Sequence, residues 1–522
     1  MPSSARPSRR TAVRATAAAL GVGTACALAV PLAGPAQAWP STSLRSAVTG
    51  VSSTSQELVL AGASWTRTTG ALTGVVDPRE RVAGLDALPK DADGRYVWTS
   101  QFELIAPTGA TREDLVLVEA ENRGSPLVLT ALHDLPLLAA PTTPTGVTYP
   151  AGLGNAFLAQ QGVSYARVQW ETGISAGVPA TAQGVGEVIV RDLGRLLEGR
   201  TPRPAGAPAL PRYDGSVLAG VSQSAWFVNT LVAEGFNVDP RSGRRVFDAA
   251  VAVSGAGNWL AINQLAGAAA QRPYVLPDGV PLRLDQLLTR PQTDPTFVDV
   301  ANYTDFYRVR ASVSAQGDLP WRRARRYDWP SPHAGAAYPD ATVFGALRCN
   351  GGVVVPRNPI NYRPYLRTVV EDLTRVVEQP GTAVRGALPP SRRFRTTAAP
   401  QGSASFNDLP GVALQVPQVD PDTAQPLGGV RFPEAVLPLG RPLPVALTPV
   451  GTTSIVDLCG NWGGWQPFSA AELATRYGSV DQYVARYARA VDRQVRAGYL
   501  RAEERQGMLD VARTSFLAAP QT

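Results

Sequence analysis

The chain has 522 residues, of which 44% are hydrophobic and 17% are charged. A sequence of this length and composition buries a sizeable core, which excludes a mainly disordered protein. Lys90 is the only lysine among 49 basic residues, and the arginines are spread along the chain. Nucleic-acid binding needs a basic cluster. The one cluster present, at Arg322, Arg323, Arg325 and Arg326, is expected to be a solvated strand edge, so no nucleic-acid partner is expected.

The first 38 residues are expected to be a cleaved signal peptide. Four arginines between positions 6 and 14 precede an apolar run at 17–31, and Ala36-Gln37-Ala38 has the small-x-small pattern of a cleavage site. The run is shorter than the roughly 20 residues that span a bilayer. We therefore expect a secreted protein without stable membrane insertion. The Arg9-Arg10 pair leaves Sec and twin-arginine export both open.

The cysteines fit an oxidising compartment. Cys26 leaves with the signal peptide, so Cys349 and Cys459 remain in the mature chain. We expect these two to form a disulfide; the alternative is two separate buried thiols.

Strands and helices alternate through the first two thirds of the mature chain. Short strands are expected between residues 56 and 122, the strongest at Leu115–Val118, whose apolar run is typical of a buried strand. Further strands are expected at 166–170, 217–219, 249–253, 297–301 and 323–327, with helices at 185–197 and 226–232. This alternation predicts an α/β fold, with a mostly parallel sheet and helices on both faces.

The remainder of the chain has two different characters. Residues from about 380 to 452 are rich in Pro and Gly, which predicts an irregular wrap or lid. From about 469 to 517 the apolar spacing predicts C-terminal helices, with Tyr483, Val484, Tyr487, Val491 and Val495 facing a core. No internal repeat is visible, so residues 39–522 are expected to form a single elaborated domain.

Ser222 is the strongest candidate for a functional residue. It lies in Gly220-Val221-Ser222-Gln223-Ser224, directly after an expected buried strand and directly before a helix. A nucleophilic serine on a strand–turn–helix elbow needs this context, because small neighbours permit the strained turn. The usual pattern is G-x-S-x-G, and here Ser224 occupies the last position. The alternative role is a plain helix cap.

A catalytic serine needs a base, and the chain offers only His133 and His333. In an α/β hydrolase the order is Ser, then acid, then His, which selects His333 and leaves His133 as a structural residue. The acid is then expected between Ser222 and His333. Position alone favours Asp305, just past an expected strand, among the other candidates Asp248, Asp278, Asp285, Asp294, Asp299 and Asp318.

Acyl transfer also requires hydrogen-bond donors for the oxyanion. One is expected from the backbone N–H of Gln223, the residue after the nucleophile. The second is expected from Asn122, Arg123 or Gly124, in the loop that follows the strand at 115–118. The alternative for that loop is a simple turn.

These motifs together resemble a bacterial α/β-hydrolase-domain family whose nucleophile box commonly has the form G-x-S-Q-S-G-R. The chain has Gly220 to Trp226 at that box, followed by Gly235-Phe236-Asn237 and Phe247-Asp248. Further similar segments extend over nearly the whole mature chain: Asn122-Arg123-Gly124, Thr304-Asp305-Phe306-Tyr307, Pro330 to His333, Asn358-Pro359, Tyr362-Arg363-Pro364 and Pro389 to Arg392.

The resemblance implies Ser222 as nucleophile, Asp305 as acid and His333 as base. The chain departs from the family pattern at three places. Ala225 and Trp226 replace Gly and Arg beside the nucleophile, Asp305 replaces a Glu, and a proline precedes His333.

The function expected from these residues is that of a secreted serine esterase acting on a small-molecule or polymeric ester. No metal or organic cofactor is expected, because two distant histidines make a poor zinc site and no G-x-G-x-x-G follows a strand. An amidase or peptidase with the same triad, or a catalytically silent secreted binding protein on the same scaffold, are the alternatives. The oligomeric state is not predicted.

Overall fold

The computed structural model describes residues 46–80, 82–136, 146–175, 177–260, 281–317, 324–333, 346–348, 354–379, 387–399, 413–444 and 459–519. The expected signal peptide at 1–38 and Cys349 of the expected disulfide lie outside these residues, so both stay predictions. Within the described ranges no helix is both long enough and apolar enough to cross a bilayer.

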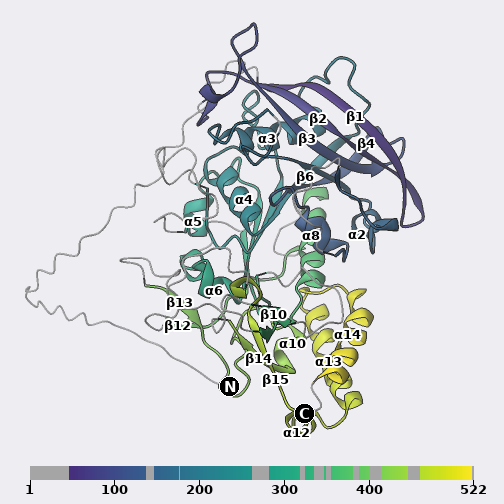
Figure 1. Ribbon diagram of the computed structural model, residues 1–522, viewed down its shortest axis with the longest axis vertical. Coiled ribbons are helices and arrows are strands. Elements are labelled where there is room, and N and C mark those ends of the chain that lie inside the picture. Colours follow the sequence, from purple (N-terminus) through teal and green to yellow (C-terminus); the bar gives the residue numbers. More distant parts are fainter. Residues whose placement is uncertain are drawn as a thin grey trace, which may run out of the picture. The chain divides into compact units, whose positions relative to one another are not determined.

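The central element is a nine-stranded sheet with the order β1-β2-β3-β5-β4-β6-β7-β8-β9. Figure 1 labels five of its strands, β1, β2, β3, β4 and β6. Neighbours from β5 onward in this order are parallel, whereas β1, β2, β3 and β5 pair antiparallel. The prediction of a mostly parallel sheet is confirmed. The strands are β1 (Ala47–Leu60), β2 (Ala63–Val76), β3 (Tyr96–Pro107), β4 (Arg112–Ala120), β5 (Ser164–Val168), β6 (Arg212–Val221), β7 (Ala249–Val253), β8 (Thr296–Asn302) and β9 (Ala324–Trp329).

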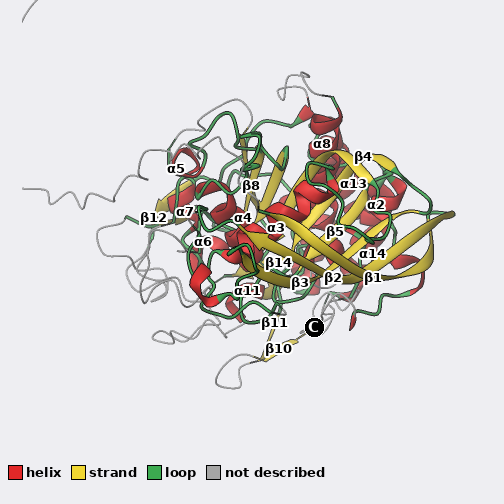
Figure 2. Cartoon of the chain, turned by 90° about the horizontal axis from the view of Figure 1, so that it is seen from above, coloured by secondary structure: helices red, strands yellow, loops and turns green. Residues whose placement is uncertain are grey.

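The N-terminal strands are longer than the sequence suggested. Instead of short segments, β1 and β2 form one hairpin of two 14-residue strands, and Figure 2 shows it at the opposite end of the sheet from β8. The turn residues Ala61 and Gly62 have φ values of 50° and 80°, as a tight hairpin turn requires. The strands were underestimated because residues 52–57 of β1 are all polar, on both faces of the strand, which breaks the apolar alternation that marks a strand.

Helices cover both faces of the sheet. The apolar side chains of α3 (Val185–Leu197) and α4 (Gln223–Ala233) belong to one core cluster. Those of α1 (Leu127–Leu132) and α8 (Arg363–Glu378) belong to a second cluster on the other face. The helix predicted at 185–197 is confirmed with the same bounds, because its apolar positions recur at helical spacing. Shorter helices are η1 (Leu85–Ala87), η3 (Ala151–Leu153), α2 (Phe157–Gln160), α5 (Leu284–Leu287), α6 (Asp305–Arg308) and α7 (Ala311–Ser314).

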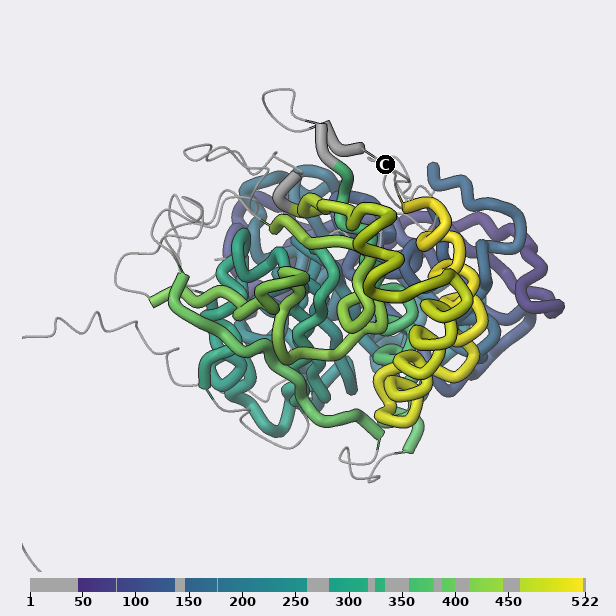
Figure 3. The backbone as a smooth tube through the Cα atoms, turned by 90° about the horizontal axis from the view of Figure 1, so that it is seen from below, coloured from purple at the N-terminus to yellow at the C-terminus, as the bar shows by residue number. Residues whose placement is uncertain are grey.

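The C-terminal part begins with short elements and ends in helices, which Figure 3 shows side by side at the yellow end of the chain. The predicted C-terminal helices are confirmed, and Ser469 and Ser479 start the first two with capping boxes. Tyr483, Tyr487 and Val491 are buried, as predicted, whereas Val484 and Val495 are half-buried and pack against the margin of the same core cluster. The elements are β10 (Ala346–Arg348), β11 (Val354–Pro356), β12 (Thr396–Ala398), β13 (Gln415–Pro417), α10 (Pro433–Val436), β14 (Gly440–Leu443), α11 (Cys459–Trp462), β15 (Gly464–Pro467), α12 (Ala470–Tyr477), α13 (Val480–Arg496) and α14 (Glu504–Ala518).

Candidate active site

Ser222 lies on a strained turn between β6 and α4. Its backbone angles, φ 62° and ψ −124°, are unfavourable for a residue with a Cβ and cost about 1–3 kcal/mol. A Cβ on Gly220 would lie 2.4 Å from the carbonyl oxygen of Ser224, so the turn requires glycine there. The Ser224 hydroxyl accepts a hydrogen bond from the Val221 N–H and donates one to the Val221 carbonyl, each at 2.9 Å. Ser224 therefore stabilises the turn from inside.

A continuous chain of hydrogen bonds joins Ser222, His333 and Asp305. Nε2 of His333 lies 2.7 Å from Oγ of Ser222, and its Nδ1 lies 2.6 Å from Oδ1 of Asp305. Asp305 is fully buried and His333 is 5% exposed. When Nδ1–H donates to the carboxylate, Nε2 is left as an acceptor for the serine proton. The structure thus brings together the three residues that the sequence selected.

Asn302, the last residue of β8, fixes the carboxylate. Its backbone N–H donates to Oδ2 of Asp305 at 2.7 Å. Its side chain accepts from the Ser331 hydroxyl at 2.6 Å and donates to the Ser254 hydroxyl at 2.7 Å. The loops after β7, β8 and β9 are therefore tied together through one buried amide. Sequence reasoning missed Asn302, although a polar residue at the end of a parallel strand beside the acid candidate was an available signal.

The loop that carries His333 is attached to the loop that carries the acid. The backbone N–H of His333 donates to Oγ1 of Thr304 at 2.7 Å, and the N–H of Tyr303 donates to the Ser331 carbonyl at 2.9 Å. Two short bonds between adjacent loops limit how far the imidazole can move relative to the carboxylate.

The loop after β4 forms a tight turn next to the nucleophile. The backbones of Asn122 and Ser125 exchange two hydrogen bonds of 2.9 Å, while Arg123 and Gly124 have φ values of 50° and 80°. The Asn122 side chain donates to the carbonyl of Val221, the residue before Ser222, at 3.0 Å. Because its own N–H is taken up inside the turn, Asn122 acts at this site through its side chain.

The other described acid candidates have different partners. Asp299 lies inside β8, where the guanidinium of Arg326 pairs with both Asp299 and Asp328. The carboxylates of Asp248 and Asp285 pair with Arg245 and Arg283, and Asp294 accepts from the backbone of Arg290. Asp278 and Asp318 lie outside the described residues.

The arginine cluster is not a solvated strand edge in its described part. Arg326 is fully buried and Arg325 is 9% exposed, and the segment around Arg392 pairs along the outer edge of β9. The expectation is wrong for these two residues because Asp299 and Asp328 supply the compensating charge for Arg326, and Arg325 donates to the Pro389 and Ala324 carbonyls. Arg322 and Arg323 lie outside the described residues.

His133 is a structural residue, as predicted. It is buried, with Nδ1 3.0 Å from the Leu153 carbonyl and Nε2 accepting from the Leu158 N–H at 3.1 Å. Burial lowers its pKa to about 4, so the ring is neutral at neutral pH. Across the described ranges no group of three His, Cys, Asp or Glu side chains is arranged to bind a metal ion.

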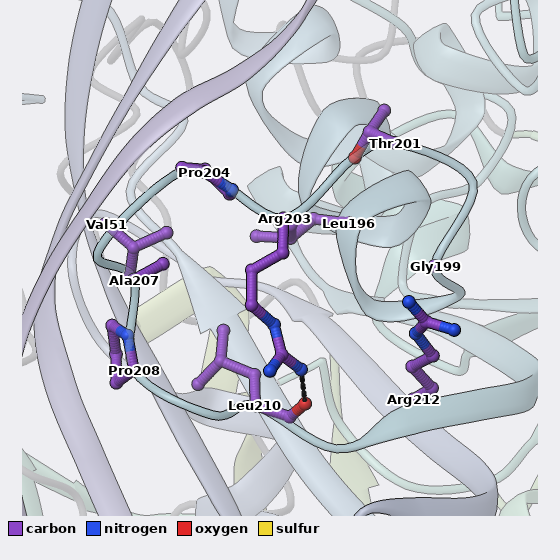
Figure 4. A pocket seen from close by; sticks show the side chains of 10 residues that line it. All are labelled: Val51, Leu196, Gly199, Thr201, Arg203, Pro204, Ala207, Pro208, Leu210 and Arg212. Atoms are coloured by element: carbon purple, nitrogen blue, oxygen red, sulfur yellow. Dashed lines mark hydrogen bonds between the residues drawn. The ribbon is translucent and has the colours of Figure 1, made fainter.

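A small pocket lies away from this site (Figure 4). It is formed by the end of α3, the following loop, the start of β6 and Val51 of β1, and its lining residue Arg203 donates to the Leu210 carbonyl at 2.5 Å. Arg212 of the pocket begins β6, whereas Ser222 follows the last residue of that ten-residue strand. The pocket is therefore at the other strand end and takes no part in the site.

Comparison with known proteins identifies a family match over most of the chain. The model of a family described as "Alpha/beta hydrolase domain" matches residues 146–510. No curated protein matches.

Solved structures that are similar to this chain have low identity and low TM-scores. A CE15 glucuronoyl esterase from Teredinibacter turnerae is 14% identical, with 64% of this chain and 79% of that chain covered and a TM-score of 0.29. A cold-adapted esterase from an Arctic intertidal metagenomic library is 12% identical, with coverages of 51% and 86% and a TM-score of 0.24. Prolyl oligopeptidase B from Galerina marginata is 12% identical, with coverages of 54% and 41% and a TM-score of 0.25.

Proposed function

The chain belongs to the alpha/beta hydrolase domain family, and from this premise we propose that it is a serine hydrolase that cleaves carboxylic esters. The observation that supports the proposal most is the hydrogen-bonded chain from the Ser222 hydroxyl through the His333 imidazole to the Asp305 carboxylate. An uncharged serine becomes a useful nucleophile only when a base in this position removes its proton.

In the proposed reaction, Oγ of Ser222 attacks the ester carbonyl carbon while Nε2 of His333 takes the hydroxyl proton. Asp305 keeps the imidazole in the required tautomer and stabilises its positive charge. The proton then passes to the leaving alkoxide, and the alcohol departs from an acyl-enzyme. Water, deprotonated by the same imidazole, attacks the acyl carbon. The imidazolium then returns this proton to Oγ of Ser222 as the bond to the acyl group breaks, which releases the acid and free Ser222.

The negative oxygen of each tetrahedral intermediate needs donors that are in place beforehand. The backbone N–H of Gln223 is the first, because it begins α4, whose N-terminus favours negative charge. The second comes from the turn of Arg123 and Gly124, which the Asn122 side chain ties to the nucleophile turn.

The strain at Ser222 favours an enzyme over a silent binding protein. A binding protein gains nothing from a turn that costs about 1–3 kcal/mol to present one hydroxyl to an imidazole. An amidase with the same triad is the nearer alternative, since only the leaving group differs. Paired ester and anilide substrates with a common acyl group distinguish the two activities.

We also propose that the protein is exported, with residues 1–38 removed as a signal peptide. The basic start, apolar run and Ala36-Gln37-Ala38 pattern support this. N-terminal sequencing of the protein recovered outside the cell should begin at Trp39. An intact N-terminus on a protein that stays inside the cell contradicts the proposal.

The esterase is tested by hydrolysis of p-nitrophenyl esters from acetate to decanoate, with Ser222→Ala and Ser254→Ala compared. Ser254 offers a matched control, because it follows the neighbouring strand β7 and also has a positive φ, of 58°. We expect Ser222→Ala to abolish turnover and Ser254→Ala to reduce it by about tenfold at most. Equal losses in the two variants, or none in either, contradict the assignment of Ser222.

A further inference from the structure

The residues at the end of β5 contact both sides of the expected oxyanion site. Arg167 is the fourth residue of β5, and Trp170 and Glu171 follow the strand. All three are buried. None of them was singled out by the sequence patterns.

Two of these side chains hold the turn after β4 from its two ends. The indole Nε1–H of Trp170 donates to the Glu121 carbonyl at 2.7 Å, and Nη1 of Arg167 donates to the Gly124 carbonyl at 2.9 Å. These two carbonyls bracket the peptides that carry the N–H groups of Arg123 and Gly124. Together with the two backbone hydrogen bonds between Asn122 and Ser125, these contacts restrain the peptide planes in between and the direction of their N–H groups.

Arg167 is itself immobilised by charge. Its Nε lies 2.7 Å from Oε2 of Glu103 and its Nη1 lies 2.9 Å from Oε2 of Glu121, with side chains that are 0–3% exposed. Buried, hydrogen-bonded ion pairs of this kind are expensive to break. The guanidinium is thus a rigid support beneath the turn.

The same segment also contacts the nucleophile side of the site. The Gln223 side chain donates to Oε1 of Glu171 at 3.1 Å, and Gln223 is the residue whose N–H is the first expected donor. The ring of Trp170 packs on that of Phe227 in α4, with centroids 4.2 Å apart. One short segment therefore contacts the elements that carry both donors.

We propose that Arg167, Trp170 and Glu171 are positioning residues that set the distance and orientation of the two oxyanion donors. The inference rests on the proposed esterase function. Donors that stabilise a transition state act only if they are in place before charge develops. Loss of one support lowers kcat and leaves KM nearly unchanged, because the ground-state ester does not depend on the donors.

The first test compares Trp170→Phe with Trp98→Phe. Both changes remove the same atoms from a buried tryptophan, but among the described residues the indole N–H of Trp98 has no hydrogen-bond partner. With p-nitrophenyl butyrate we expect Trp170→Phe to lower kcat by about 10–100-fold with KM within about twofold. Trp98→Phe should keep kcat within about threefold. Phenylboronic acid, which forms a tetrahedral adduct with an active serine, should bind more weakly to Trp170→Phe in proportion to the fall in kcat.

The second test exchanges the partners of one hydrogen bond. Gln223→Glu places two carboxylates side by side and should lower kcat by about tenfold or more. Adding Glu171→Gln restores one donor and one acceptor, and should return kcat most of the way to that of the wild type. A gain of activity from a second substitution cannot come from general loss of folding.

The outcomes separate this inference from the proposed function. A folded wild-type protein that turns over no ester and is not labelled by a fluorophosphonate overturns the proposed function. An active wild type in which Trp170→Phe is no slower than Trp98→Phe, or in which KM rises while kcat stays constant, overturns the positioning role alone. If adding Glu171→Gln does not raise the kcat of Gln223→Glu, the positioning role of Glu171 is overturned.

Discussion

Replacing Asp305 by Asn tests the assigned base and acid together, because it keeps the shape of the side chain and removes its charge. The carboxylate accepts two hydrogen bonds, one at Oδ1 from His333 and one at Oδ2 from the Asn302 N–H. An amide has one acceptor and one donor, so it cannot satisfy both. If its oxygen faces Asn302, its NH2 faces Nδ1 of His333 and forces the ring proton onto Nε2, where the serine proton has to go.

We expect Asp305→Asn to lower kcat by about 10⁴-fold, equivalent to about 5 kcal/mol of transition-state stabilisation, with little change in KM. Steady-state hydrolysis of a p-nitrophenyl ester measures both parameters, and circular dichroism checks the fold. Asp305→Glu is the matched control: it keeps the carboxylate, so it should lose less than Asp305→Asn. A folded Asp305→Asn variant within tenfold of wild-type kcat refutes the reasoning.

Three further predictions concern stability. The free energy of unfolding should be about 1 kcal/mol higher for Ser222→Gly than for Ser222→Ala, because glycine accepts a φ of 62° without strain. Equal free energies of unfolding in urea contradict the claim that the Ser222 backbone is strained. Burial raises the pKa of Glu198 to about 8, so its protonated form favours the folded state and stability is lost as pH rises through 8. In urea denaturation, the free energy of unfolding should fall by about 2 kcal/mol between pH 6.5 and 8 because of this group. If Glu198→Gln shows the same dependence of stability on pH as the wild type, the role of Glu198 is contradicted. Burial lowers the pKa of His133 to about 4, so its contribution to stability is present above pH 6.5 and is lost as pH falls toward 4. In His133→Gln the free energy of unfolding should depend less on pH in this range. An unchanged pH dependence contradicts the assignment of His133 as a buried neutral residue.

Features that depend on local sequence could be predicted closely. The strand at 249–253 and the helix at 185–197 have the predicted bounds, because an apolar run and an apolar helical stripe are local patterns. His333 could be predicted as the partner of Ser222 because the chain has only two histidines. The order of elements therefore identified the fold and the loops that carry its chemistry.

Features that depend on distant contacts could not be predicted. The insertion of β5 between β3 and β4 is set by pairing between strands far apart in sequence. Arg326 was expected in solvent because the carboxylates that neutralise it come partly from the neighbouring strand. Similarly, nothing local indicates that the indole of Trp170 reaches the Glu121 carbonyl, 49 residues earlier.

Covalent labelling of the mature protein by a fluorophosphonate, followed by peptide mass spectrometry, tests the central claim most directly. The phosphorus reacts only with a serine whose proton a neighbouring base can accept. We predict one adduct per chain, on the peptide that contains Ser222, and labelling slowed by about 10³-fold or more in His333→Ala. A folded wild-type protein that acquires no adduct, or acquires it on another serine, contradicts the account.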